Sequence, residues 1–228
     1  MGNDDKLRFY YLLYKKGKWR VRALFKRAQI AIIFRLGKRK KPEIPKTTKG
    51  LQMIHIGCGR INIPGFINID PIPYSHVHYV TDKLTDLSMF ANESIDLIYM
   101  SHVLEHIGIR EVESVIWEMN RVLKKGGILR ISVPDFEKLA VIYHSEGSDI
   151  KAINYYLMGN QDHQYNFHHS IYSKKYLINI LMEMGFSKVE EWDPQNCSDH
   201  DFRDESLSKL TTKNGKEYLV SLNLEGIK

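Results

Sequence analysis

Residues 51–70 place two apolar stretches around a glycine turn, and this arrangement constrains the fold more than any other part of the chain. An apolar run, residues 53–56, leads directly into Gly57-Cys58-Gly59, and a second run, residues 66–69, ends at Asp70. Parallel strands that end side by side, one in a glycine turn and one in a carboxylate, form a nucleoside crevice in an open α/β sheet. Glycine lets the backbone approach a ligand closely, and Asp70 can accept hydrogen bonds from both hydroxyls of a ribose.

The spacing between the glycines and the acid indicates which nucleoside fits. A dinucleotide-binding turn requires a third glycine three residues after the second, and an acid about twenty residues further on. This chain has Asn62 at the third position, and Asp70 follows Gly59 much sooner. No nearby helix start is shaped for a pyrophosphate. The sequence therefore favours S-adenosylmethionine, which has a ribose and an adenine but no phosphate, and leaves NAD as a distant alternative.

After residue 49 the pattern alternates between strands and helices, as a doubly wound α/β sheet requires. We expect helices near 110–124 and near 174–184. Gly126-Gly127 is expected to form the C-terminal cap of the first. The first helix has one apolar face: Val112, Val115, Ile116, Met119 and Val122 or Leu123. The last two strands read as a reversed hairpin that closes the sheet. Seven strands are expected, near 52–56, 66–69, 77–80, 95–100, 128–133, 187–192 and 217–226.

Further motifs follow the glycine turn in a fixed order: Thr85-Asp86-Leu87-Ser88-Met89-Phe90, Ser101-His102-Val103-Leu104-Glu105-His106, Arg121-Val122-Leu123-Lys124-Lys125-Gly126-Gly127, Pro134-Asp135 and Tyr165-Asn166-Phe167-His168. With these motifs, residues 51–228 resemble the class I S-adenosylmethionine-dependent methyltransferases, and in particular bacterial methyltransferases associated with polysaccharide biosynthesis. The glycine turn alone is a weak signal, whereas several elements in the same order are a strong one. The resemblance implies a mostly parallel seven-stranded Rossmann-like sheet and S-adenosylmethionine as cofactor.

The resemblance also implies which residues hold the cofactor. In resembling enzymes the pair that corresponds to Asp86-Leu87 contacts the adenine amino group. The set expected to bind S-adenosylmethionine is Gly57, Cys58, Gly59, Asp70, Asp86, Leu87 and Ser101.

Two histidines are the candidate catalytic residues. Sugar hydroxyls are poorly acidic, so O-methylation benefits from a base that titrates near neutral pH, and histidine fits that need. His102 follows the fourth expected strand, and His168 stands where resembling proteins also carry a histidine in a Tyr-x-Phe-His setting. We prefer His168 as the substrate-facing residue and read Glu105 and His106 as mostly architectural, although they could also orient a base. No metal-ligand spacing such as His-Glu-x-x-His is present, so no metal site is predicted.

Residues 134–173 interrupt the regular alternation and are rich in tyrosine, phenylalanine and histidine. An insertion after the fifth strand lies over the carboxyl ends of the strands, where ligands bind in open sheets. Aromatic and histidine side chains suit stacking on a sugar ring and hydrogen bonding to its hydroxyls. The sequence favours a substrate lid, with a second small core as the alternative.

The positive charge is concentrated at the N-terminus. Residues 1–49 carry sixteen Lys or Arg and three acidic residues, a net charge of +13, whereas the remainder carries a net charge of −7. A helix is expected from Leu7 to Leu36, followed by a linker with Pro42 and Pro45 and a basic cluster at 38–41. One helical face is apolar, with basic side chains opposite, which suits an anionic membrane surface. The apolar residues are Val21, Leu24, Phe25, Ala28 and Ile32.

Three partners for this N-terminal helix stay open: a membrane surface, the catalytic domain, or a second copy of the chain. No segment resembles a nucleic-acid module, which disfavours RNA.

Two cysteines give no disulfide framework, so a reducing compartment is expected, with the protein cytoplasmic or peripheral at the inner membrane face. The predicted function is O-methylation of a sugar or of a glycan or glycolipid precursor. The alternative is a non-catalytic scaffold with the same fold.

Overall fold

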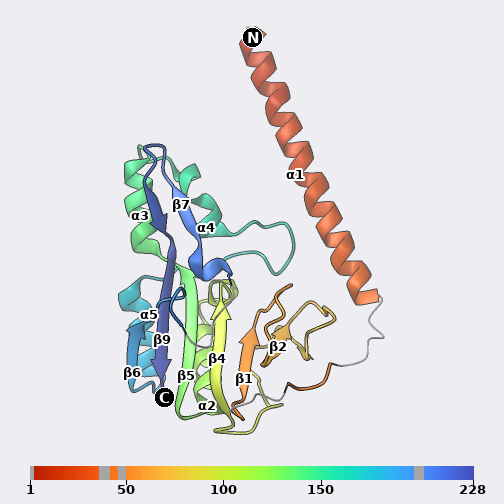
Figure 1. Ribbon diagram of the computed structural model, residues 1–228. Helices are drawn as coiled ribbons and strands as arrows, with labels where there is room; N and C mark the ends of the chain where they lie inside the picture. Colours follow the sequence, from red (N-terminus) through yellow and green to blue (C-terminus); the bar gives the residue numbers. More distant parts are fainter. Residues whose placement is uncertain (1–2, 36–41, 46–49, 198–202) are drawn as a thin grey trace.

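A seven-stranded sheet forms the centre of the molecule (Figure 1), in a computed structural model that describes residues 3–35, 42–45, 50–197 and 203–228. The strand order is β3-β2-β1-β4-β5-β9-β6. Neighbours from β3 to β5 are parallel, and β9 runs antiparallel to both β5 and β6. The strands are β1 (Met53–Ile56), β2 (Phe66–Asp70), β3 (Tyr79–Val80), β4 (Ile95–Ser101), β5 (Leu123–Pro134), β6 (Lys188–Glu191) and β9 (Ser221–Ile227). This topology confirms the predicted fold class.

The main core lies between the sheet and two helices, α2 (Val112–Val122) and α5 (Lys174–Glu183). The expected face of α2 is buried, because Val112, Val115, Ile116, Met119 and Val122 are at most 1% exposed. The described connections from β1 to β4 contain no α-helix. Turns and loops therefore surround the carboxyl ends of β1, β2 and β3.

The glycine pair after α2 does not cap the helix, contrary to the sequence prediction. Leu123 already has an extended backbone, and its N–H donates to Met119 as the C-cap. Gly126 and Gly127 instead lie within β5. Gly126 adopts a φ of +76°, and a Cβ on Gly127 would lie 2.8 Å from the Lys124 carbonyl oxygen. The two glycines are needed for a tight bend at the start of the strand.

Residues 134–173 combine a small second core with loops over the sheet. They form α3 (Phe136–Ser145), the short η2 (Ile150–Ala152) and α4 (Asn154–Met158). A hairpin of β7 (Lys209–Thr211) and β8 (Glu217–Leu219) packs against them. The expected single strand at 217–226 is thus divided at Val220. The buried residues of this second core are Leu139, Ile142, Ile153 and Val220.

The start of α3 has a clear local cause that the sequence prediction did not use. The Asp135 carboxylate accepts hydrogen bonds from the backbone N–H groups of Glu137 and Lys138, so it caps the helix.

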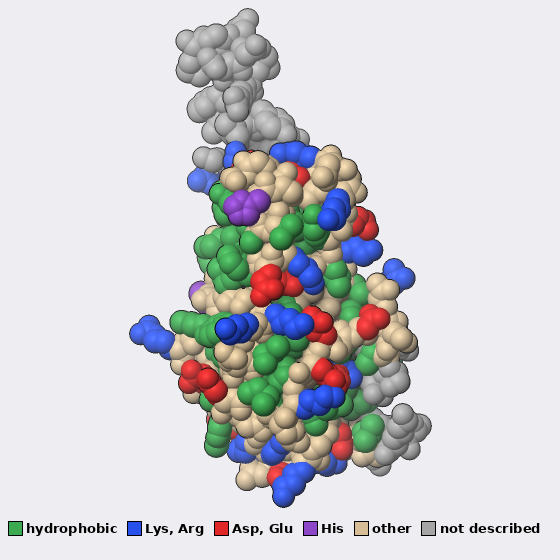
Figure 2. Space-filling model, turned by 90° about the vertical axis from the view of Figure 1, so that its left-hand side faces the viewer, with side chains coloured by type: hydrophobic (Ala, Val, Ile, Leu, Met, Phe, Trp, Pro, Cys, Tyr) green, Lys and Arg blue, Asp and Glu red, His purple; other side chains and the backbone are tan. Residues whose placement is uncertain are grey.

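Figure 2 shows the face over α3, α5 and β6, where charged side chains of both signs separate the hydrophobic ones.

The N-terminal helix α1 (Asn3–Arg35) extends away from the sheet, with its C-terminal part beside the loops (Figure 1). Ala23 is buried, Lys26 forms an ion pair with Asp162 at 3.3 Å, and the Arg27 Nε donates to the Asp162 carbonyl oxygen. Lys26 and Arg27 therefore contact the domain, while Arg20 and Arg22 are exposed. The apolar side points outward, with Leu24 72% and Phe25 66% exposed.

Among the described residues, no helix is long and apolar enough to cross a bilayer. The expected basic cluster at 38–41 lies outside the described residues.

Candidate active site

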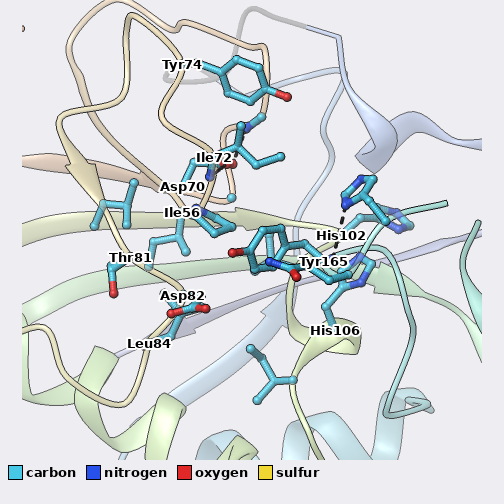
Figure 3. A pocket seen from close by; sticks show the side chains of 18 of the residues that line it. Ile56, Asp70, Ile72, Tyr74, Thr81, Asp82, Leu84, His102, His106 and Tyr165 are labelled. Carbon is cyan, nitrogen blue, oxygen red and sulfur yellow. Dashed lines mark hydrogen bonds between the residues drawn. The ribbon is translucent and has the colours of Figure 1, made fainter. Parts of the chain in front are cut away.

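A cavity of about 400 Å³ lies over the carboxyl ends of β1, β2 and β4. Figure 3 shows Asp70, Ile72 and Tyr74 on one side of it, with His102, His106 and Tyr165 on another. Ile56, Ile69 and Leu84 form an apolar floor. The cavity has the position and the mixed lining of the predicted nucleoside crevice.

The glycine turn brings the backbone close to this cavity. Gly57 and Gly59 both adopt positive φ, at +67° and +53°. A Cβ on Gly57 would lie only 2.2 Å from the Val103 Cγ2 atom, whereas a Cβ on Gly59 would meet nothing within 4 Å. Glycine is therefore required for space at the first position and for conformation at both.

Asp70 is joined directly to the glycine turn. Its Oδ2 accepts a hydrogen bond from Gly59 N at 2.7 Å, and its Oδ1 accepts one from Ile72 N at 2.8 Å. Burial raises the pKa of this carboxyl, since the side chain is only 5% exposed, and the two backbone donors oppose that rise. A carboxylate has about four lone-pair sites, so two remain for a ligand.

The other residues expected at the cofactor take different positions. Cys58 is buried, and both Cys58 and Ser101 line a neighbouring cavity rather than the first one. Leu87 is fully buried, and its N–H donates to the Glu118 carboxylate at 2.6 Å. Asp86 is exposed and turned towards Ser88, whose hydrogen bonds lower its pKa. Of the two acids Asp82 and Asp86 in this loop, Asp82, which follows Thr81, is the one that lines the cavity.

A second cavity of about 430 Å³ adjoins the first. The residues common to both linings include Gly57, Gly59, His102 and His106. The remaining lining is mostly polar and aromatic. Part of it comes from the 134–173 segment, namely Tyr155, Tyr156, Asn166 and His168, and Asp204 and Glu205 come from the stretch before β7. Two small molecules, one bound in each cavity, would contact each other beside the glycine turn and His102.

His102 stands at this junction with both ring nitrogens engaged. Its Nδ1 lies 2.9 Å from a Glu105 carboxylate oxygen, and its Nε2 lies 2.9 Å from the Ser221 hydroxyl. Burial opposes the charged imidazolium, but the Glu105 carboxylate raises the pKa of His102 above its ordinary value. The residue also adopts a φ of +53°, which a non-glycine residue seldom does and which clusters at functional sites.

Glu105 is the most deeply buried carboxylate of the site, only 1% exposed. It lies in η1 (Leu104–His106), where burial disfavours its charge, but His102 and the other nearby imidazoles lower its pKa overall. His168 sits close by, with its ring centroid 4.8 Å from that of His106. Burial lowers the pKa of His168, which favours a neutral imidazole at pH 7. The structure thus gathers His102, His106 and His168 around the buried Glu105 carboxylate.

Two features of the cavities escaped the sequence analysis. Lys26 of α1 lines the first cavity, together with Tyr165, although helical periodicity alone could not show which side of α1 would face the domain. Tyr74 also lines it and stacks on His76, whose Nε2 lies 3.0 Å from the Gly59 carbonyl oxygen. The aromatic pair follows β2 directly, a position that could have been noticed in the sequence.

Residues 66–131 match the family model of a methyltransferase domain. No curated protein matches the chain in sequence. The solved structures that it resembles include an S-adenosylmethionine-dependent methyltransferase of Thermotoga maritima, at 17% identity and a TM-score of 0.47, covering 96% of this chain and 98% of that one. Another is an S-adenosylmethionine-dependent methyltransferase of Archaeoglobus fulgidus, at 14% identity and a TM-score of 0.47, covering 96% and 100%. A third, from Methanosarcina mazei, has 15% identity and a TM-score of 0.47, covering 82% and 94%.

The functional assignment rests on the family match together with the sheet order. The match over residues 66–131 supports the expectation of an S-adenosylmethionine-dependent methyltransferase, an enzyme that uses S-adenosylmethionine. The sheet order is the one expected for that fold.

Proposed function

We propose that this methyltransferase O-methylates a hydroxyl of a sugar, in a glycan or glycolipid precursor. The observation that carries the proposal is the pair of adjoining cavities. One combines an apolar floor with Asp70, and the other is lined by tyrosines, histidines, Asn166 and carboxylates. Aromatic rings and mixed hydrogen-bonding groups are suited to a polyhydroxylated ring.

The first cavity fits the expected cofactor. S-adenosylmethionine, when bound, supplies an electrophilic methyl group. We assign the ribose to the free lone pairs of Asp70, and the close backbone approach to Gly57, where a side chain would collide with Val103. Ile56, Ile69 and Leu84 offer apolar surface to the adenine.

The choice between Asp82 and Asp86 can be tested directly. We expect Asp82→Ala to weaken S-adenosylmethionine binding severalfold, because Asp82 lines the cavity, and Asp86→Ala to leave the affinity unchanged, because its carboxylate is held by Ser88 outside it. Calorimetric titration of both variants decides the matter. The reverse order of effects would place the adenine where the resemblance puts it, at the Asp86-Leu87 pair.

The second cavity is assigned to the acceptor, with His168 as its substrate-facing residue. We expect His168→Ala to lower kcat by about 10²–10⁴-fold if the residue assists proton removal. S-adenosylmethionine affinity should stay within twofold, since His168 does not line the first cavity. The measurement is turnover and cofactor affinity on the same samples, with a panel of sugar acceptors. A variant that kept both kcat and acceptor KM would move this role to His102.

The alternative of a non-catalytic scaffold predicts a different result. Such a protein could bind S-adenosylmethionine through the intact glycine turn but would transfer no methyl group to any acceptor. Intact Gly57, Gly59 and Asp70, together with His168 in an adjoining cavity, favour the enzyme.

We further propose that α1 attaches the enzyme reversibly to an anionic membrane surface. The support is the outward apolar stripe, where Val21, Leu24, Phe25 and Ile32 are all at least 53% exposed. Arg20 and Arg22 are exposed beside this stripe. Basic residues near an anionic surface contribute about 1 kcal/mol each, and apolar insertion adds to that.

Liposome flotation tests the membrane proposal. We expect the full chain to float with anionic vesicles, less so at high salt because exposed charges are screened. Leu24→Glu with Phe25→Glu should abolish flotation while leaving Lys26 at the cofactor cavity. Met182→Glu, at another exposed apolar residue, on α5, serves as the control. Loss of an oligomer by the double variant, without any vesicle binding by the wild type, would make the stripe a subunit contact.

A further inference from the structure

Three potential metal ligands converge on one wall of the second cavity. The Glu105 carboxylate and one ring nitrogen each of His106 and His168 offer ligand atoms that all lie within 4.8 Å of one another. All three residues line the cavity. Two imidazoles and one carboxylate, with an open side towards a cavity, form the donor set of many mononuclear metal sites.

The histidine tautomers suit a metal. The Nδ1 atoms of His106 and His168 lie 3.0 Å from the Phe167 carbonyl oxygen and 2.9 Å from the Tyr156 carbonyl oxygen. A carbonyl only accepts, so each Nδ1 carries the proton and each Nε2 keeps a free lone pair. A backbone carbonyl on the outer nitrogen is the usual partner of a metal-bound histidine.

The buried Glu105 carboxylate has only one hydrogen-bonding partner, His102, for its two oxygens among the described residues. Glu105 Oε1 lies 2.9 Å from His102 Nδ1, but Oε2 has no hydrogen-bond partner among the described residues. An unsatisfied buried carboxylate oxygen carries a large desolvation cost. A cation between Glu105 and the two histidines would satisfy it.

The backbone holds the three ligands in place. His169 N and Ser170 N both donate to the Glu105 carbonyl oxygen, at 2.7 and 3.2 Å. These bonds fasten the segment after His168 to η1, so the ligands from distant parts of the chain are already assembled.

We propose that Glu105, His106 and His168 bind one divalent transition metal ion, of the class of Zn²⁺, Co²⁺ or Fe²⁺. The two imidazole nitrogens favour these ions over Mg²⁺ and Ca²⁺, which take oxygen ligands. The site faces the cavity assigned to the acceptor, and its role rests on the proposed function. With His168 as a ligand, the metal rather than the imidazole itself would assist proton removal, because a bound metal would hold an acceptor hydroxyl and make it more acidic. His102 then acts as a positioning residue that fixes the Glu105 carboxylate.

Metal binding is tested without any methyltransferase assay. Untagged full-length protein, stripped with a chelator, is titrated calorimetrically with Zn²⁺, and with Co²⁺ while its visible absorption is followed. We expect one ion per chain and intense Co²⁺ bands of a low-coordinate site. His106→Ala and His168→Ala should each weaken binding by more than the 10–100-fold that loss of an outer-shell partner causes.

The controls separate this site from other sources of metal binding. His144→Ala removes an exposed histidine of α3 and should bind as tightly as the wild type. Glu105→Gln keeps the shape of the buried side chain, and thermal unfolding checks that each variant is folded. Absence of stoichiometric binding by the wild type, or wild-type affinity in either histidine variant, would overturn the proposal. S-adenosylmethionine titration and acceptor turnover are measured separately. If the proposed function fails, the metal titrations still show whether the three residues bind an ion.

Discussion

Asp70→Ala is expected to abolish most of the affinity for S-adenosylmethionine. Each hydrogen bond to a charged group is worth about 1.5–3 kcal/mol, which corresponds to a rise in Kd of roughly 10–150-fold per bond lost. Asp70 also holds the glycine turn through Gly59 N, so the substitution removes a ligand contact and loosens the backbone beside it. We therefore expect the Kd to rise by at least about 100-fold. Calorimetric titration with the cofactor measures this effect.

The matched control for Asp70 is Asp193. Its Oδ1 accepts a hydrogen bond from Gln195 N at 2.9 Å, the same local turn that Asp70 forms with Ile72, but it is exposed and lines neither cavity. Asp193→Ala should bind the cofactor as the wild type does. Asp70→Asn keeps the size of the side chain and should still lose affinity, because one of its two oxygens becomes a donor facing an N–H group. Wild-type affinity in Asp70→Ala would remove this residue from the site.

The local parts of the site could be predicted from the sequence because they depend on short-range chain geometry. An apolar run that ends in glycines, followed by a second run that ends in Asp70, already implies two neighbouring parallel strands. The structure adds that Gly59 N and Asp70 share a hydrogen bond. The seven strands follow from apolar patterning in the same way. Two details differ. The Gly126-Gly127 pair is equally typical of a helix cap and of a sharp bend into a strand, and the strand expected at 217–226 is divided at Val220.

Parts that depend on tertiary packing could not be predicted. His168 is sixty-three residues from Glu105 in sequence, and only the bonds between η1 and the segment after α4 bring them together. A motif such as His-Glu-x-x-His detects only ligands that are close together in sequence, so it does not detect such a cluster. The same reasoning applies to α1. Its periodicity defines an apolar stripe but does not show that Lys26 and Arg27, on the opposite side, contact Asp162 of the domain. In the loop before β4, no periodicity distinguished Asp82 from Asp86.

Gly57→Ala should damage the protein more than any other single methyl group added at the site. The new Cβ would lie 2.2 Å from Val103 Cγ2, and Gly57 has a φ of +67°. The left-handed backbone costs about 1–2 kcal/mol for a residue with a Cβ. Overpacking adds about 1–3 kcal/mol. We therefore expect a loss of about 2–5 kcal/mol in the free energy of unfolding, measured by urea denaturation, together with weaker cofactor binding because the turn must shift.

Two variants divide this loss into its causes. Gly59→Ala has a similar positive φ of +53° but meets no atom within 4 Å, so it should lose only the conformational part of the stability. Val103→Ala in the Gly57→Ala background removes the colliding methyl group and should restore stability relative to Gly57→Ala alone, although Val103→Ala by itself is destabilising. Equal losses for Gly57→Ala and Gly59→Ala, with no restoration in the double variant, would show that the turn does not pack against Val103.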